Sequence, residues 1–359
     1  MSGPRVVVAM SGGVDSSVAA ALLLQQGYEV IGMMMRLWSE PGMEDQNRCC
    51  TPDALAQARR VANQLNIPFY AVDARVAFYD AIVTNFVSDY AQGLTPNPCI
   101  NCNRHIRWTF LLQRALSIGA QFMATGHYVR LVQQEGIIRL QQAVDLHKDQ
   151  SYVLHVLTQE QLKHALFPLG GYTKPQVRQL ARDFNLPVAE RAESQDLCFL
   201  GEGDYRSFLE RNSPNIKSSG PIFASDGKLL GEHHGLAFYT IGQRKGIPVN
   251  SSTPLYVIRK DMHRNALIVG KLEDLGQDHL TAEHINWVDG NPPLQSRHLM
   301  VKIRYKAQPV RALVTPLPDQ SAYVQFEQNL RDITPGQAAV FYDQDMVVGG
   351  GIIRPESHS

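Results

Sequence analysis

A glycine- and serine-rich loop between an apolar run and a helical stretch is the feature that most constrains this chain. The run "RVVVAM" (5–10) predicts a buried strand, and "SSVAAALLLQQG" (16–27) predicts a helix that ends at Gly27. Unpaired N–H groups and the positive end of the helix dipole then point into the loop. Such a junction suits an anionic ligand.

Strands and helices continue to alternate up to about residue 127. This order predicts a parallel sheet with helices on both faces, a doubly wound α/β fold. Ligands of such sheets bind beyond the carboxyl ends of the strands, where three of the loops fall. The predicted strands are 28–35, 68–72 and 120–127, and the predicted helices are 51–67, 75–93 and 104–119.

The length of 359 residues exceeds what one hydrophobic core usually organises, so two or three domains are expected. Helical patterns continue at 149–166 and 173–186. From about residue 212 short alternating segments with turn residues replace them, and beyond 276 strands joined by short turns predict a small β-barrel. The predicted domains are 1–205 (catalytic), 206–275 (small central domain) and 276–359 (β-barrel).

The charge balance, the length of the apolar stretches and the number of cysteines limit the class of protein. Lys plus Arg and Asp plus Glu both number 34, so binding of nucleic acid requires a local basic patch. No apolar stretch reaches the ~18 residues of a membrane span, which predicts a cytoplasmic protein. The five cysteines are an odd number without a signal peptide, which argues against a disulfide framework and favours reactive or metal-binding thiols.

The loop "SGGVDSS" (11–17) lacks the G-x-x-x-x-G-K-[ST] pattern of a Walker A motif. A plain tight turn that needs glycine is the alternative interpretation. The whole string resembles the pyrophosphate loop of the ATP pyrophosphatases, which cleave ATP between its α- and β-phosphates and transfer AMP to a substrate oxygen. The resemblance implies a fold of the adenine nucleotide alpha hydrolase (HUP) type, glycines that admit phosphates, serines that donate hydrogen bonds, and Asp15 as a Mg²⁺ ligand.

Three cysteines stand in chemically suggestive positions. Cys99 and Cys102 form a C-x-x-C pair, and Cys198 follows in "ESQDLCF" (193–199). A C-x-x-C pair alone can be a redox pair, half of a zinc site or part of an iron–sulfur site, and zinc normally takes four ligands. Cys49 and Cys50 are predicted to be buried structural thiols.

Six strings along the chain resemble one family, the tRNA-specific 2-thiouridylases. They are "SGGVDSS" (11–17), "NPCINCNRHIRW" (97–108), "ATGHY" (124–128), "KDQSYVL" (148–154), "ESQDLCF" (193–199) and "GLAFYTIGQRKG" (235–246). The resemblance covers essentially the whole chain. It implies an ATP-dependent exchange of sulfur for oxygen at C2 of the wobble uridine (position 34) in tRNAs for Lys, Glu and Gln, through adenylation of the C2 oxygen.

The family also implies roles for the thiols. The cysteine at the position of Cys198 carries sulfur as a persulfide, supplied by a sulfur-relay protein or a cysteine desulfurase, and Cys102 is the nucleophile that attacks it. Cys99 departs from the family pattern, because many members have aspartate there. Three thiols are also enough for a [4Fe–4S] cluster with one open iron. The persulfide relay, the cluster and an inert Cys99 therefore remain as alternatives.

The resemblance carries over further site residues. In the barrel segment "KIRYKAQPVRA" (302–312), Lys302, Arg304 and Lys306 are expected on one strand face and Tyr305 on the other, which suits RNA. The expected ATP-binding residues are Ala9, Met10, Ser11, Gly12, Gly13, Val14, Asp15, Ser16, Met35 and Gly126. The expected tRNA-binding residues are Asn97, Pro98, Cys99, His127, Lys148, Asp149, Gln150, Arg304, Tyr305 and Gln337.

Simpler interpretations stand beside these assignments. Met35 can be a core methionine, His127 a structural histidine, residues 148–150 a helix cap, and the basic strand face a solvated surface. Two other functions were weighed: an AMP-forming ligase that acts on a small molecule, and an RNA-binding or iron–sulfur protein without turnover. The expected oligomeric state is a monomer.

Overall fold

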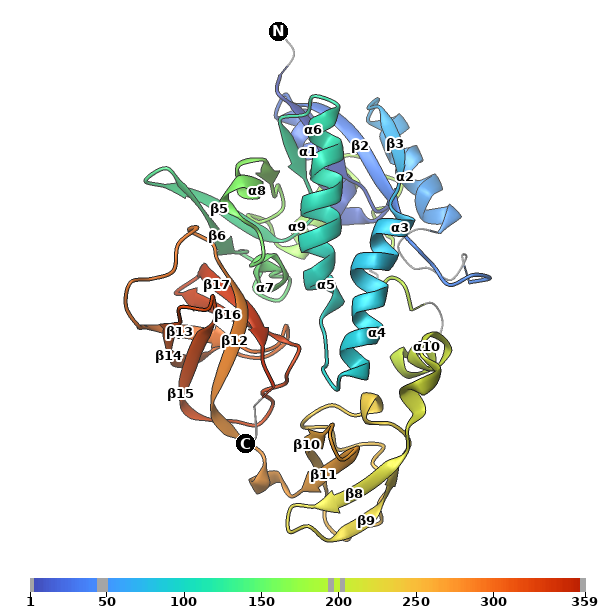
Figure 1. Cartoon of the computed structure of the whole chain (residues 1–359). Coiled ribbons are helices and arrows are strands. Elements are labelled where there is room, and N and C mark those ends of the chain that lie inside the picture. The colour runs from blue at the N-terminus through green and yellow to red at the C-terminus, as the bar shows by residue number, and fades with distance from the viewer. Residues whose placement is uncertain (1–2, 44–50, 193–196, 201–203, 356–359) are drawn as a thin grey trace.

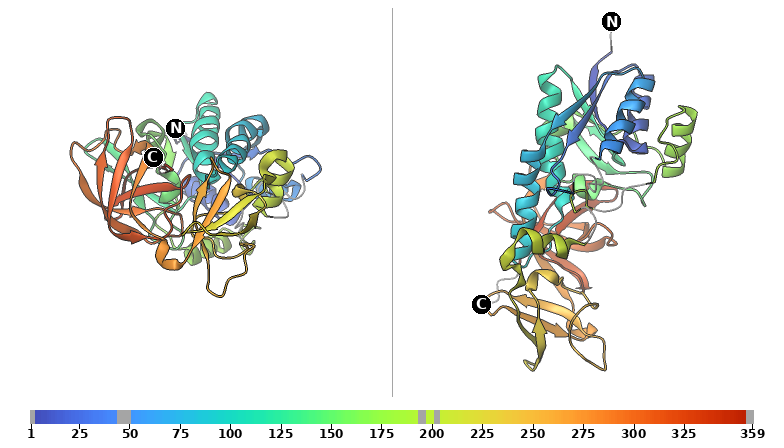
Figure 2. Two further views of the ribbon diagram at one scale, coloured as in Figure 1. Left: turned by 60° about the horizontal axis from the view of Figure 1, so that its bottom comes forward. Right: turned by 90° about the vertical axis from the view of Figure 1, so that its right-hand side faces the viewer.

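The computed structural model describes residues 3–43, 51–192, 197–200 and 204–355. Three β-sheets organise them. The α/β part with the N-terminus lies at one end of the molecule, and the C-terminal barrel and a smaller sheet lie below it (Figures 1 and 2). Cys49 and Cys50, predicted as structural thiols, lie outside the described residues. Within the described part of the chain, every helix is too short or too polar to cross a membrane.

The first sheet has five parallel strands in the order β3-β2-β1-β4-β7. The predicted α/β fold is therefore confirmed. Apolar runs such as "VVV" at 6–8 are fully buried because helices cover both faces of this sheet. The strands are β1 (Arg5–Ala9), β2 (Glu29–Arg36), β3 (Phe69–Asp73), β4 (Phe122–Ala124) and β7 (Ala165–Leu166).

Local capping signals set the helix ends. Gly27 has a φ of +86° after α1 (Val14–Gln25), and Thr51 accepts a hydrogen bond from the Ala54 N–H at the start of α2 (Pro52–Gln64). The remaining helices of the α/β part are α3 (Arg75–Phe78), η2 (Tyr79–Val83), α4 (Thr84–Ala91), α5 (Pro98–Asn101), η3 (Cys102–Leu111), α6 (Leu112–Ser117), α7 (Ser151–Leu154), α8 (Gln159–Lys163) and α9 (Lys174–Asp183).

Two of the long helices contain π-helical stretches, η2 and η3, which the sequence did not indicate. Their threonine hydroxyls bond carbonyls five residues back, as in Thr109 Oγ1 to the Arg104 carbonyl at 2.6 Å. π-Helical turns are rare and often lie at functional sites. Here η3 begins at Cys102.

Helix α10 (Tyr205–Asn212) and the 3₁₀ turn η4 (Pro214–Lys217) lead into a four-stranded sheet with the order β10-β11-β8-β9. Strands β8 and β11 pair in parallel, so this unit is not a simple meander. Its strands are β8 (Gly220–Ala224), β9 (Leu229–His233), β10 (Tyr256–Asp261) and β11 (Ala266–Gly270), with the 3₁₀ turns η5 (Leu236–Phe238) and η6 (Leu272–Asp274).

Six C-terminal strands close into a barrel, because β12 pairs with both β15 and β17. The predicted β-barrel is confirmed. Its inward side chains form a separate apolar core. The strands are β12 (Gln277–Trp287), β13 (Arg297–Lys302), β14 (Val310–Pro316), β15 (Ala322–Leu330), β16 (Ala338–Asp343) and β17 (Met346–Ile353).

The structure departs from the predicted secondary structure in three places. A hairpin of β5 (Val129–Gln134) and β6 (Ile137–Gln142) was not anticipated, and it joins the barrel sheet through β17. The helix expected at 149–166 is α7, α8 and β7, because Thr158 starts a new helix with its own capping box. Residues 302–306 were expected to alternate between the two faces of a strand. The strand β13 ends at Lys302, so they do not.

Candidate active site

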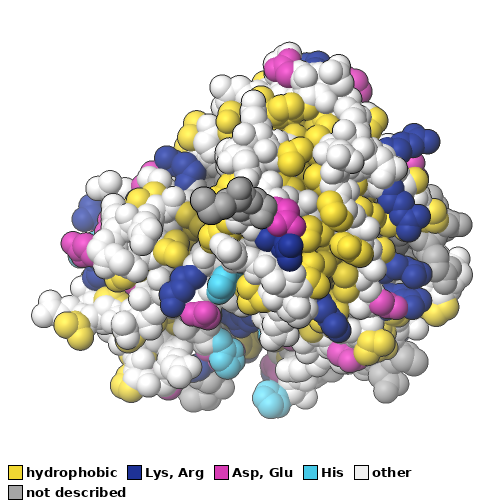
Figure 3. Space-filling view, turned by 90° about the horizontal axis from the view of Figure 1, so that it is seen from above, with side chains coloured by type: hydrophobic (Ala, Val, Ile, Leu, Met, Phe, Trp, Pro, Cys, Tyr) yellow, Lys and Arg dark blue, Asp and Glu magenta, His cyan; other side chains and the backbone are white. Residues whose placement is uncertain are grey.

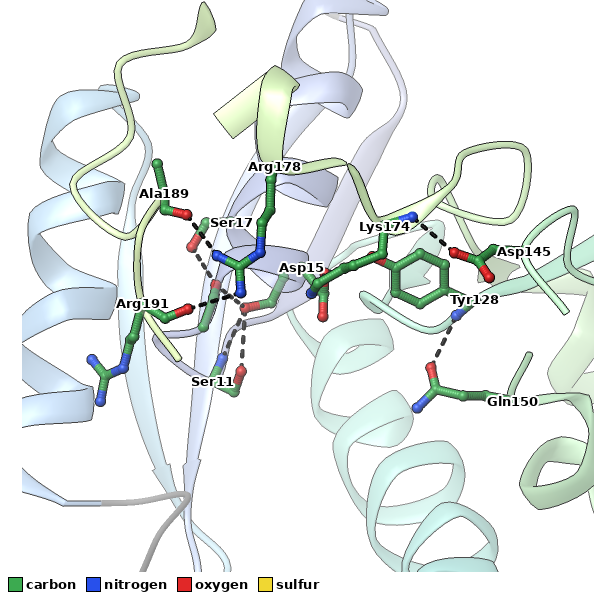
Figure 4. A network of polar contacts seen from close by, with 12 residues as sticks. Ser11, Asp15, Ser17, Tyr128, Asp145, Gln150, Lys174, Arg178, Ala189 and Arg191 are labelled. Carbon is green, nitrogen blue, oxygen red and sulfur yellow. Dashed lines mark hydrogen bonds and ion pairs between the residues drawn. The ribbon is translucent and has the colours of Figure 1, made fainter. Parts of the chain in front are cut away.

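The loop between β1 and α1 is held by its own serines (Figure 4). Ser16 Oγ accepts a hydrogen bond from the Ser11 N–H at 3.2 Å and donates to the Gly13 carbonyl at 3.3 Å. Ser17 Oγ donates to the same carbonyl at 2.8 Å. Gly13 is the N-cap of α1, so the positive end of the helix faces the loop without a capping side chain.

Two glycines make this loop sterically possible. Gly12 has a φ of +72°, and a Cβ there would lie 2.3 Å from the Ala54 carbonyl oxygen. A Cβ on Gly126 would lie 2.7 Å from the Ser16 backbone nitrogen. Gly126 therefore lets the end of β4 pack directly on the first turn of α1, a contact that the sequence did not indicate.

Asp15, in the first turn of α1, receives two donors on one oxygen. Tyr128 Oη donates to Asp15 Oδ1 at 2.7 Å, and Lys174 Nζ donates to the same atom at 2.7 Å. The lysine side chain is only 10% exposed. Neither donor was among the predicted site residues, although Tyr128 lies in the quoted string "ATGHY".

Residues between 145 and 150 fix the backbones of both donors. Gln150 Oε1 accepts a hydrogen bond from the Tyr128 N–H at 3.0 Å, and Asp145 Oδ2 accepts one from the Lys174 N–H at 2.9 Å (Figure 4). The side chain of Gln150, which was expected to contact tRNA, thus supports the wall of the loop 11–17. This loop is called the ATP loop below, after its resemblance to the pyrophosphate loop of the ATP pyrophosphatases. Sequence spacing could not reveal these contacts, because Gln150 bonds to Tyr128 and Asp145 bonds to Lys174 across 22 and 29 residues of the chain.

Asp15 is also the carboxylate expected to bind Mg²⁺. No group of three or more His, Cys, Asp or Glu side chains that could hold a metal occurs among the described residues. Magnesium commonly binds through one or two carboxylates together with substrate phosphates, so Asp15 alone fits that mode. An iron–sulfur cluster needs three converging thiols, and the described cysteines do not form such a group.

Two of the predicted thiols share one apolar cluster. Cys102 is 6% exposed, and Cys198 is half-buried against the same core, which includes Phe86 and Phe199. Met35, at the end of β2, packs on this core as well as on the core that contains Ala9 at the end of β1. Met35 therefore connects the strand ends next to the ATP loop with the apolar core that holds Cys102 and Cys198.

Cys99 lies at a different place from the other two thiols. It is exposed at the start of α5, where its N–H donates to Asn97 Oδ1 at 3.1 Å. Burial raises the pKa of Tyr305, and the nearby Asp149 and Cys99 add to this effect.

The barrel presents Lys302 between two aromatic rings. Lys302 Nζ lies 5.8 Å from the ring centre of Tyr152 and 5.6 Å from that of Tyr305. Burial lowers the pKa of Lys302. Tyr305 Oη donates to the Asp149 carbonyl at 3.3 Å. Lys302 and Tyr305 therefore lie on the same side, against the expectation of opposite faces.

Three predicted tRNA-binding residues, Pro98, His127 and Asp149, are buried. Burial, with the nearby charge of Arg107, lowers the pKa of His127 to about 3, so this imidazole is neutral at pH 7. Asp149 accepts hydrogen bonds from the Ala143 N–H and the Ser151 hydroxyl. Asp149 therefore holds neighbouring protein groups, while the N-cap of α7 is Gln150, which makes no side-chain capping bond, and Lys148 is half-buried.

Arg304 and Gln337 occupy the junction of the three units. Arg304 Nη2 donates to the Ile241 carbonyl at 3.2 Å and to Thr334 Oγ1. Gln337 Nε2 donates to the Thr95 carbonyl at 2.7 Å, in the loop before α5. Both side chains tie the barrel to its neighbours.

Charges on the outer surface of the α/β part are mixed. The view from above shows basic and acidic side chains interspersed with apolar ones (Figure 3). This agrees with the balanced total of charged residues and directs attention to local basic groups such as Lys302.

A parallel sheet with an anion-suited loop at its carboxyl edge and two thiols beside it defines an α/β enzyme that handles a phosphorylated nucleotide. Family models agree. Residues 4–202 match "tRNA methyl transferase HUP domain", 206–271 match "tRNA methyl transferase PRC-barrel domain", and 277–353 match "Aminomethyltransferase beta-barrel domain".

Relatives cover nearly the full length. The chain is 49% identical to the tRNA-specific 2-thiouridylase MnmA of Magnetococcus marinus, over 97% of this chain and 98% of that protein. It is 47% identical to the MnmA of Chloroflexus aurantiacus, over 98% and 99%. The chain belongs to the tRNA-specific 2-thiouridylase family, and it is an enzyme of the tRNA-uridine 2-sulfurtransferase class.

Solved structures match part of the chain. NMN synthetase from Francisella tularensis aligns with 57% of this chain and 71% of that one, at 19% identity and a TM-score of 0.35. A 4-thiouridine synthetase in complex with RNA and ATP aligns with 59% and 51%, at 16% identity and a TM-score of 0.37.

Proposed function

We propose that this enzyme thiolates C2 of the wobble uridine (position 34) in tRNAs for Lys, Glu and Gln, as a monomer in the cytoplasm. ATP-dependent thiolation of tRNA uridine is the activity of its family. The proposal includes a division of labour among residues 1–205, 206–275 and 276–359. The first unit carries the chemistry, and the other two hold the anticodon arm.

In the first step the uridine C2 oxygen attacks the α-phosphate of ATP. The α–β bond breaks, pyrophosphate leaves, and the base carries AMP on its oxygen. Residues 9–16 hold the phosphates, with Met35 and Gly126 beside the nucleotide. Asp15 would hold Mg²⁺, which neutralises phosphate charge when it is bound.

In the second step sulfur replaces the activated oxygen. Cys198 receives sulfur as a persulfide from a relay protein or a cysteine desulfurase. The Cys102 thiolate attacks the Cys198 sulfur, a disulfide forms, and the released sulfide attacks C2 and expels AMP. A thiol reductant then restores both cysteines. The shared apolar cluster of Cys102 and Cys198 supports this pairing.

The persulfide course is preferred to an iron–sulfur course. Cys99 is exposed and lies near Tyr305, whereas Cys102 is buried with Cys198. In the proposal Asn97, Pro98 and Cys99 contact the target base. Other RNA contacts in the proposal come from His127, residues 148–150, Arg304, Tyr305 and Gln337. Some of these side chains act indirectly, because they hold together the surface that binds the RNA.

The packing of Met35 on the core that holds both thiols and on the core reached by the strand end before the ATP loop is the observation that supports the proposal. Its test is pyrophosphate release from ATP with and without unmodified tRNA, combined with mass spectrometry of the tRNA nucleosides. We expect release that requires tRNA and 2-thiouridine at position 34 when a persulfide donor is present. Release that requires a small acid or amide instead, or no release at all, would overturn the proposal.

A further inference from the structure

The ATP loop has a buried cation that the family resemblance did not supply. Lys174 is the first residue of α9, and its side chain reaches the first turn of α1, where Nζ lies 2.7 Å from Asp15 Oδ1. Tyr128 Oη donates to the same oxygen, and Lys174 Nζ lies 5.9 Å from the Tyr128 ring centre. Two donors therefore fix one carboxylate beside the N-terminus of α1 (Figure 4).

Stability alone does not explain this ion pair. Removing an ammonium group from water is costly, and apolar replacements of buried ion pairs are often neutral or stabilising. A negative Asp15 at the N-terminus of α1 would also repel phosphates. Lys174 cancels that charge at the place where the loop needs a positive potential.

A second cation of α9 provides a contrast. Arg178, one helical turn further on, donates to the Ala189 carbonyl at 2.9 Å and to the Arg191 carbonyl at 3.2 Å. Its guanidinium binds these two carbonyls and secures the chain after α9. Lys174 reaches the Asp15 carboxylate inside the loop, and a more highly charged ligand can compete for it.

We propose that Lys174 is a phosphate-contacting residue of this enzyme, which leaves Asp15 for the β- and γ-phosphates of ATP, and that Tyr128 positions Asp15 during the exchange. The inference rests on the proposed function, because these phosphates become the pyrophosphate leaving group. The Lys174 side chain favours the departing pyrophosphate, whose negative charge grows as the α–β bond breaks.

Binding of three ligands tests the proposal on the full-length enzyme with Mg²⁺: the α,β-methylene analogue of ATP, inorganic pyrophosphate and AMP. We expect K174M to lower the affinity for the analogue and for pyrophosphate by about 10- to 100-fold, since a charge-assisted contact is lost. The affinity for AMP should fall by less than about twofold. We expect K174R to restore most of the pyrophosphate affinity. Lys163 pairs with Glu160 at 3.0 Å on the surface of α8, so K163M is the matched control and should change nothing.

Wild-type pyrophosphate affinity in K174M would overturn the proposal, and so would an equal loss of AMP and pyrophosphate. K174Q, which keeps a hydrogen-bond donor for Asp15, carries the same test if K174M does not fold. Y128F should weaken binding of the analogue by less than K174M does, by about three- to tenfold, because one hydrogen bond from an uncharged donor to the Asp15 carboxylate is lost. A wild-type enzyme without tRNA-dependent release, but with the K174M defect intact, would refute the proposed function and leave the phosphate contact standing.

Discussion

The ATP loop and the thiol region are assembled in different ways. The loop is seven consecutive residues whose serines bond to carbonyls within the same segment. Cys102 and Cys198 instead come from distant segments and meet in an apolar core. Under the proposed function, the contrast teaches that ATP chemistry resides in a local motif, whereas sulfur chemistry depends on how the α/β part packs. Damage to the loop should therefore stop both steps, and damage to a thiol only the second.

The largest expected effect separates these two steps. Cys198→Ser should lower formation of 2-thiouridine by at least about a thousandfold, because a hydroxyl cannot carry the persulfide sulfur. Pyrophosphate release that depends on tRNA should stay within about threefold of wild type. Both are measured on the same tRNA, with Cys102→Ser as the partner variant. Loss of release in Cys198→Ser would mean that the two regions are not separable.

The next effect breaks the loop. Gly12→Ala places a Cβ 2.3 Å from the Ala54 carbonyl at a φ of +72°. We expect a loss of about 3–5 kcal/mol in unfolding free energy and loss of both pyrophosphate release and thiolation. Gly171→Ala is the control, since a Cβ there meets no atom within 4 Å. A Gly12→Ala protein with wild-type release would show that the loop tolerates another conformation.

A smaller effect is expected from two buried histidines, His127 and His155. Burial lowers the pKa of His127 to about 3 and that of His155 to about 4. In the unfolded chain these histidines have their ordinary pKa near 6.5, so below that pH the unfolded state binds more protons than the folded state. The free energy of unfolding is therefore fully present above about pH 6.5 and decreases as the pH drops below that value. We expect a loss of about 2–4 kcal/mol in unfolding free energy between pH 7.5 and 5.0, by denaturant titration.

A variant of one buried histidine sharpens that measurement. His155→Gln should make the pH dependence shallower, while His147→Gln, at an exposed position, should leave it unchanged. Equal slopes in all three proteins would contradict the assignment.

The smallest effect distinguishes the thiols from one another. Cys99→Ser should change 2-thiouridine formation by less than about threefold, because Cys99 lies outside the cluster of Cys102 and Cys198. Iron content and visible absorbance after anaerobic purification are the second measurement. A loss as large as that of Cys198→Ser, together with bound iron, would replace the persulfide course by a cluster course.

Regular patterns made most of the α/β part predictable. The buried strand at 6–8, the cap at Thr51 and the end at Gly27 follow from local rules. The β5–β6 hairpin was missed although its two six-residue strands pair with each other, and only its junction with β17 depends on a distant segment. The site was also predicted only in part. The loop residues are consecutive in the sequence and could be recognised there, but Lys174 and Tyr128 converge on Asp15 only in the folded chain.

The amino-acid order alone determined the anion-suited loop, the succession of strands and helices, and the family to which the chain belongs. These features depend on glycine conformations, capping and apolar periodicity, which act over a few residues. Tertiary structure alone decided which thiols share a core, that Gln150 and Asp149 hold protein rather than solvent, and that a lysine of α9 enters the ATP loop. Such contacts depend on packing between distant segments, and no local pattern encodes them.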